Sequence, residues 1–190
     1  RVIFLDDRGM NEKLKPMPMP MVIGRVNQVL LDEGVRSLAS IVAISGEIVD
    51  SHSSACMIGF GASAIYPYLL YATALDACKK SNLGAYEIKT RLKNINHALG
   101  QGLMKVMSKM GIATIASYQN SALFDVIGLS SDIVNECFNG AISLIPGLKY
   151  EDIEARLNSN HALAYELKLT TKLFPLEIGG FYKYIDGKEY

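Results

Sequence analysis

Short apolar runs, each followed by a segment of helix length, recur along this 190-residue chain and constrain its fold more than any other feature. Such alternation is typical of strand-helix units built around a parallel sheet. Four units can be recognised, with strands expected at residues 2–5, 37–44, 62–66 and 112–117. The helices that follow are expected at residues 21–32, 51–59, 67–80 and 122–127. The pattern predicts an α/β fold of parallel strand-helix repeats, barrel-like or half of a barrel.

A segment at residues 83–110 interrupts these repeats. It is rich in Lys and Asn and carries apolar residues at helical spacing, which predicts a helical insertion that Gly100 and Gly102 break into two helices. Beyond it we expect an apolar run at 142–145 that ends at Pro146 and Gly147, a helix at 150–169, and a loop and hairpin at 174–190 with a turn at Asp186-Gly187. No low-complexity linker is present, so residues 1–190 are expected to form a single domain.

The end of the inserted segment has the composition of a helix terminus. Lys105 and Lys109 lie in its last turns, where cations complement the carbonyl end of the helix dipole, and Gly111 is expected to supply a left-handed cap. Two interpretations of Lys105, Ser108 and Lys109 stay open. They face a ligand from the helix end, or the lysines only balance the dipole while neighbouring methionines are buried.

Charge and cysteine content exclude several classes of function. Nineteen basic residues balance nineteen acidic ones, so no long-range positive field is expected to gather nucleic acid or an anionic membrane. No apolar run reaches the roughly 18 residues needed to span a bilayer. Cys56, Cys78 and Cys137 lie in apolar stretches, which suits reduced buried thiols and predicts a cytoplasmic location. The chain begins directly with a strand-like run, as expected of a piece excised from a longer protein.

Ser45, Glu47 and His52 are candidates for a site because they directly follow an expected strand, where barrel sites gather. They could act as nucleophile, acid and base, but no spacing forces them together. The simpler interpretation is that Asp50 or Ser51 caps the next helix while Glu47 and His52 line the surface. Gly46 alone offers too few amides for a phosphate, and the three histidines are too far apart in sequence for a metal site.

Several motifs resemble the central domain of the glutamate synthase large subunit. Residues 105–114 read Lys-Val-Met-Ser-Lys-Met-Gly-Ile-Ala-Thr, followed by Ser-Tyr at 117–118 and Ile-Gly-Leu-Ser at 127–130. The family's order also matches Leu-Asp-Asp-Arg at 5–8, Ser-Gly-Glu at 45–47, Ile-Gly-Phe-Gly-Ala at 58–62 and Pro-Tyr-Leu at 67–69. Gly24-Arg25-Val26 stands where the family usually has a histidine-rich run, which indicates a divergent branch.

The resemblance covers the later half of that central domain and implies a non-catalytic connector between the glutaminase and flavin domains that helps to enclose the ammonia path. It implies that the full enzyme makes glutamate from glutamine and 2-oxoglutarate with FMN and an iron-sulfur cluster. This segment would hold no catalytic, cofactor-binding or metal-binding residue. Its candidate interdomain or channel contacts are Ser45, Glu47, His52, Lys105, Ser108 and Lys109.

Two alternatives remain. One is a free-standing α/β small-molecule enzyme or binder with its site at the carboxyl ends of the strands. The other is an interaction module, which predicts an exposed apolar face.

Overall fold

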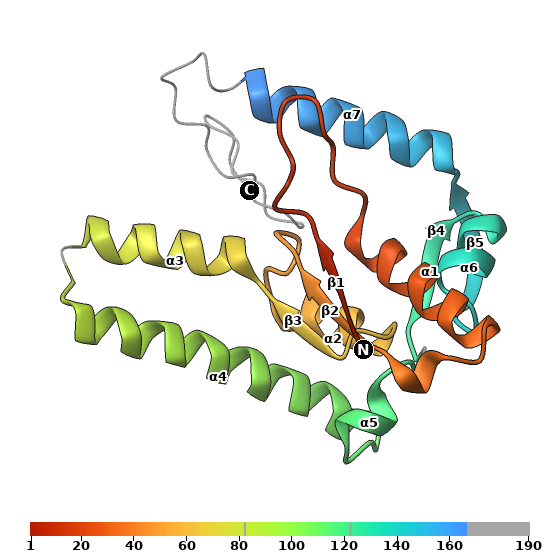
Figure 1. Ribbon diagram of the computed structural model, residues 1–190, viewed down its shortest axis with the longest axis horizontal. Helices are drawn as coiled ribbons and strands as arrows, with labels where there is room; N and C mark the ends of the chain where they lie inside the picture. Colours follow the sequence, from red (N-terminus) through yellow and green to blue (C-terminus); the bar gives the residue numbers. More distant parts are fainter. Residues whose placement is uncertain (82, 122, 167–190) are drawn as a thin grey trace, which may run out of the picture.

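The computed structural model describes residues 1–81, 83–121 and 123–166, in which strands and helices alternate (Figure 1). The strands are β1 (Val2–Asp6), β2 (Ser40–Ile44), β3 (Ala64–Tyr66), β4 (Asp125–Leu129) and β5 (Ile142–Leu148). The helices are α1 (Met19–Asp32), α2 (Ser51–Gly59), α3 (Tyr68–Lys80), α4 (Ala85–Lys109), α5 (Ile115–Tyr118), α6 (Ser131–Cys137) and α7 (Tyr150–Glu166), with a 3₁₀ turn at Arg36–Leu38. None of the helices in this described part is long and apolar enough to cross a membrane.

The first sheet is built from the first three strand-helix repeats. Its strands are parallel in the order β1-β2-β3, with Asp6 paired to Ile44 and Ile44 to Tyr66. Helices α1 and α2 contact each other as well as the sheet, so they cover the same face. Side chains alternate along a strand, and Ile41 and Ala43 of β2 are fully buried on the face that the helices cover. The predicted α/β class with parallel strand-helix repeats is confirmed.

The main core joins α1, α2 and α6 to the first sheet. Its buried members include Met21 and Ile23 of α1, Met57 of α2 and Ile133 of α6. Helices α1 and α6 approach so closely at Gly24 that a Cβ there would lie 1.7 Å from the Cys137 carbonyl oxygen. Only glycine fits this crossing.

The second sheet contains β4 and β5 alone among the described strands. The two strands are parallel, and their register shifts twice between the pairs Asp125↔Ile142, Ile127↔Ile145 and Leu129↔Leu148. β5 extends beyond the predicted end at residue 145 and includes Pro146, which an edge strand tolerates. The five described strands thus form two open sheets and no closed barrel.

The strand predicted at 112–117 and the helix predicted at 122–127 are both wrong. Thr114 instead caps the short helix α5, accepting a hydrogen bond from the Ser117 amide at 3.3 Å. Tyr118, at the end of α5, is fully buried and its hydroxyl donates to the Ala55 carbonyl oxygen at 3.1 Å. The chain then continues into β4, so the apolar residues expected in a helix lie in a strand.

The inserted segment is helical as predicted, but Gly100 and Gly102 do not break it. α4 is one helix of 25 residues that runs beside α3 as a long hairpin (Figure 1). Gly102 faces α2, where a Cβ would lie 2.0 Å from the Ser51 hydroxyl oxygen, whereas a Cβ at Gly100 would meet nothing within 4 Å. The first glycine of the pair is neutral to packing, and the second permits the close approach of two helices.

The predicted left-handed cap at Gly111 is confirmed, with φ of +73°. The Gly111 amide donates to the Ser108 carbonyl oxygen at 3.1 Å and the Ile112 amide to that of Met107 at 2.9 Å, the paired bonds of a Schellman motif. The helix predicted at 150–169 is α7, described to Glu166. The hairpin predicted at 174–190 lies outside the described residues.

Candidate functional site

The candidate site is the edge of the first sheet where β1, β2 and β3 end. Open parallel sheets in α/β proteins place their ligands at this carboxyl edge. Three segments meet there: Asp6-Asp7-Arg8 at the end of β1, Ser45-Gly46-Glu47 after β2, and Pro67-Tyr68 between β3 and the start of α3. The Ser45 amide donates to the Tyr66 carbonyl oxygen at 3.2 Å, which holds the ends of β2 and β3 together.

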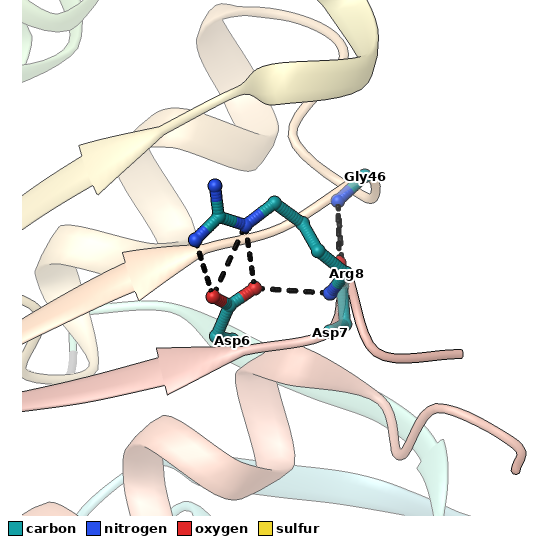
Figure 2. Close-up of polar contacts among 4 residues, drawn as sticks. All are labelled: Asp6, Asp7, Arg8 and Gly46. Carbon is teal, nitrogen blue, oxygen red and sulfur yellow. Dashed lines mark hydrogen bonds and ion pairs between the residues drawn. The ribbon is translucent and has the colours of Figure 1, made fainter.

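Asp7 connects two of these loops. Its carboxylate accepts a hydrogen bond from the Ser45 hydroxyl at 2.6 Å. It also accepts one from the Gly46 amide at 3.1 Å (Figure 2). Ser45 is fully buried, and its hydroxyl oxygen in turn accepts from the Glu47 amide at 3.1 Å. The Gly46 amide, which a bound anion would use at this turn, therefore already donates to a carboxylate of the chain itself.

Tyr68 lies beside the same carboxylate. Burial, as the main cause, and the nearby Asp7 carboxylate raise the pKa of Tyr68 to about 12. The phenol therefore stays protonated at neutral pH. The hydroxyl oxygen is buried and has no hydrogen-bond partner of good geometry among the described residues. This phenol is therefore a buried polar group of the edge whose hydrogen-bonding capacity is not used by the described residues.

Arg8 and Asp6 form an ion pair at the outer rim of the edge. The Arg8 guanidinium donates from Nε and Nη2 to the Asp6 carboxylate, with a shortest distance of 2.6 Å (Figure 2). These hydrogen bonds lower the pKa of Asp6 and raise that of Arg8. Both groups face solvent, so the pair orients the loop and contributes little to folding stability.

Glu47 connects the edge to the start of α1. The residue is exposed overall, but its carboxylate accepts a hydrogen bond from the Met19 amide at 2.8 Å. Met19 is the first residue of α1, and Pro18 before it offers no side-chain cap. Glu47 therefore satisfies a free amide and places negative charge at the positive end of the helix. Burial of the carboxyl group raises its pKa, against the opposing effect of the Met19 amide.

His52 does not join Ser45 and Glu47 in a catalytic group. Its Nε2 lies 3.5 Å from Cys56 Sγ, one helical turn along α2, and its ring packs edge-on against Phe124. The Ser45 hydroxyl donates instead to Asp7. Neither the Ser45–His52 nor the His52–Glu47 hydrogen bond of a nucleophile–base–acid relay is therefore formed. Burial raises the pKa of Cys56 to about 11, so its thiol stays protonated at neutral pH. The simpler interpretation also holds at Asp50, which caps α2 through the Ser53 amide at 2.7 Å.

Lys105, Ser108 and Lys109 all lie exposed on the last turns of α4. Ser108 borders a shallow hollow of about 390 Å³ that Met104, Met107 and residues 111–113 complete. The hollow is mainly apolar, and no lysine lines it. The two lysines are thus available to a partner surface.

The cysteines are separate free thiols, with Cys78 and Cys137 buried and Cys56 half-buried. Within residues 1–81, 83–121 and 123–166, no group of three His, Cys, Asp or Glu side chains is placed to hold a metal ion.

Sequence reasoning missed Asp7 and Tyr68, although both belong to motifs that it quoted. The available signal was position: each follows a strand, and parallel strands end at one edge of a sheet. Taken together, fold and site define an α/β unit with two open parallel sheets, whose carboxyl edge is largely filled by its own side chains.

Comparison with known proteins identifies the family. Residues 1–130 match the family described as glutamate synthase central domain, and the chain belongs to this family. It is 33% identical over its whole length to the glutamate synthase [NADPH] large chain of Bacillus subtilis. It is 32% identical to ferredoxin-dependent glutamate synthase 1 of Arabidopsis thaliana and to glutamate synthase [NADH] of Schizosaccharomyces pombe. The chain spans only 12%, 12% and 9% of the length of these three relatives.

Proposed function

We propose that this chain is a non-catalytic connector, the later half of the central domain of a glutamate synthase, and that residues 1–190 act as one domain. In this role it joins the glutaminase and FMN-binding domains of the same cytoplasmic polypeptide and helps to enclose the ammonia path. The complete enzyme makes glutamate from glutamine and 2-oxoglutarate, and its FMN and iron-sulfur cluster are held by other segments.

The observation that carries this proposal is the contact between Asp7 and the turn after β2. A phosphate group needs free amides at such a turn, yet the Gly46 amide and the Ser45 hydroxyl already donate to the Asp7 carboxylate. An anionic cofactor would have to displace that carboxylate and overcome its negative charge, together with that of Glu47 nearby. The edge therefore suits a scaffold better than a cofactor site.

The candidate interdomain or channel contacts divide into two groups by exposure. Ser45 is buried and acts by fixing the loop, whereas the other candidates are exposed and can contact a neighbouring domain directly. The exposed candidates are Glu47, His52, Lys105, Ser108 and Lys109.

Two measurements test the connector role. Titrating the 190-residue chain with FMN should give no binding, and tight stoichiometric uptake would contradict the proposal. In the complete polypeptide, reduced chemically, Lys109→Glu should lower glutamate formation driven by glutamine more than that driven by added ammonia, with FMN content unchanged. Lys93→Glu is the matched control because Lys93 is an exposed lysine of the same helix, and it should change neither rate.

The alternative function is a free-standing binder or enzyme for a small molecule at the same edge. The buried Tyr68 hydroxyl, which lacks a partner of good geometry within the described residues, is the feature that favours it. Native mass spectrometry of the chain purified from its own cells would detect such a ligand, and Tyr68→Phe should then release it.

A further inference from the structure

The surface of β4 and β5 that points away from the core exposes several large apolar side chains close together. Four of its side chains are largely exposed: Ile127 (70%), Ile142 (60%), Leu144 (87%) and Ile145 (57%). Ile127 and Ile145 are paired across the two strands, as are Asp125 and Ile142. Asp125, at the start of β4, is the one charged residue of the two strands, and β5 contains none. We refer to these four residues as the β4–β5 apolar surface.

The opposite side of the same strands is covered in the usual way. Helix α6 contacts both strands, and Val126 and Leu129 of β4 pack against the main core. Parallel strands are ordinarily covered on both faces, which is why they read as continuous apolar runs. The apolar pattern of β4 and β5 is therefore that of a sheet packed on both faces. The described residues pack against one of these faces.

The area of this surface indicates what kind of partner covers it. Four such side chains expose on the order of 500 Å², which is about the largest apolar patch found on ordinary monomers. Two free copies that met through this surface alone would fall short of the ~800 Å² per partner of a standard stable interface. A segment of the same polypeptide needs less area, because its covalent link gives it a high effective concentration at the surface. Interfaces between domains of one chain accordingly begin at ~600 Å² in total.

We propose that the β4–β5 apolar surface is the docking surface for an apolar segment of the same polypeptide. The region shared with this chain is 12% of the Bacillus subtilis protein. We place the docking segment in the part that corresponds to the rest of such a longer relative. The inference rests on the proposed role as one domain of a longer glutamate synthase, and it adds which face of this domain its neighbour covers.

The experiment measures the accessibility of one position in two forms of the protein. Leu144→Cys is introduced into the 190-residue chain and into the complete polypeptide that its gene encodes. The rate of maleimide labelling at that cysteine is followed by peptide mass spectrometry and divided by the rate in urea. Tyr86→Cys is the control, because Tyr86 is 83% exposed on α4 and lies outside the apolar surface.

We expect Leu144→Cys to react at least tenfold more slowly in the complete polypeptide than in the short chain, at every protein concentration, while Tyr86→Cys reacts equally fast in both. Equal rates for Leu144→Cys in the two forms would overturn the proposal. So would protection in the short chain that fades on dilution, since a second copy would then be the occupant. A gene that encodes no further segment would also overturn it.

Glutamate formation measured on the same preparation separates this inference from the proposed function. A protected Leu144→Cys in a polypeptide that forms no glutamate would refute the proposed function and leave the docking surface standing. A reactive Leu144→Cys in an active enzyme would refute the docking surface alone.

Discussion

Gly100 and Gly102 provide a matched pair that tests the packing of α4 against α2. Both lie in the same helix two residues apart, and replacing either with Ala should favour the helical backbone by about 0.5–1 kcal/mol. They differ in what the new methyl group meets. At Gly102 it would lie 2.0 Å from Ser51 Oγ and 2.4 Å from Ser51 Cβ, while at Gly100 it would meet nothing within 4 Å.

The magnitude follows from which atoms clash. Rotating the Ser51 hydroxyl removes only the contact with Oγ, because the position of Cβ is fixed by the backbone. One helix must therefore move, and overpacking of this kind costs about 1–3 kcal/mol. Since the helix-propensity gain is common to both variants, Gly102→Ala should be about 1–3 kcal/mol less stable than Gly100→Ala.

Equilibrium urea unfolding followed by circular dichroism measures this difference, with equal m-values as the check that only stability has changed. Ser51→Gly combined with Gly102→Ala should recover most of the loss, because the nearest remaining atom, the Ser51 Cα, lies at an ordinary 3.7 Å. If Gly102→Ala proves as stable as Gly100→Ala, the close approach of the two helices is wrong.

Three further predictions use the same unfolding assay. Gly24→Ala should cost about 3 kcal/mol or prevent folding, because its methyl group would overlap the Cys137 carbonyl oxygen, whereas Gly9→Ala, with open space around it, should be neutral. Asp50→Ala should cost about 1 kcal/mol at neutral pH through loss of a helix cap. Hydrogen bonds from the Ser53 amide and hydroxyl lower the pKa of Asp50 in the folded protein. The cost of Asp50→Ala should therefore be fully present above the ordinary pKa of 3.8 and should diminish as the pH falls through the lowered pKa of the folded state. A cost that is the same at acidic and at neutral pH would contradict the assignment. Gly111→Val should lose about 1–2 kcal/mol because the position requires positive φ, and an unchanged free energy of unfolding would refute the cap.

The sequence predicted the elements whose signals are local. The helix at 51–59 was predicted with its observed limits, and of the two expected caps, Asp50 and Ser51, the structure uses Asp50. The Gly111 cap was likewise predictable, since lysines and a glycine mark the end of a helix within a few residues. These signals need no knowledge of the rest of the fold.

The errors occurred where a distant contact decides the structure. The apolar run at 112–117 suits a strand by propensity, but Thr114 offers a helix cap and Tyr118 is fixed by a hydrogen bond to Ala55, 63 residues away. Gly102 seemed a helix breaker because its contact with Ser51 is invisible in the sequence. Tertiary contacts overrode local preference in both cases.

The Asp7 contact falls between these two cases. It joins residues 38 apart, yet it follows from strand pairing: because Asp6 pairs with Ile44, the next residues of the two strands, Asp7 and Ser45, must meet at the carboxyl edge. A carboxylate and a hydroxyl-glycine turn at matched strand ends can satisfy each other without any ligand. The pairing that builds a ligand site in other parallel sheets here brings the Asp7 carboxylate onto the Ser45 hydroxyl and the Gly46 amide. This supports the proposal that the chain acts through exposed surfaces, such as those of α4 and of the β4–β5 sheet.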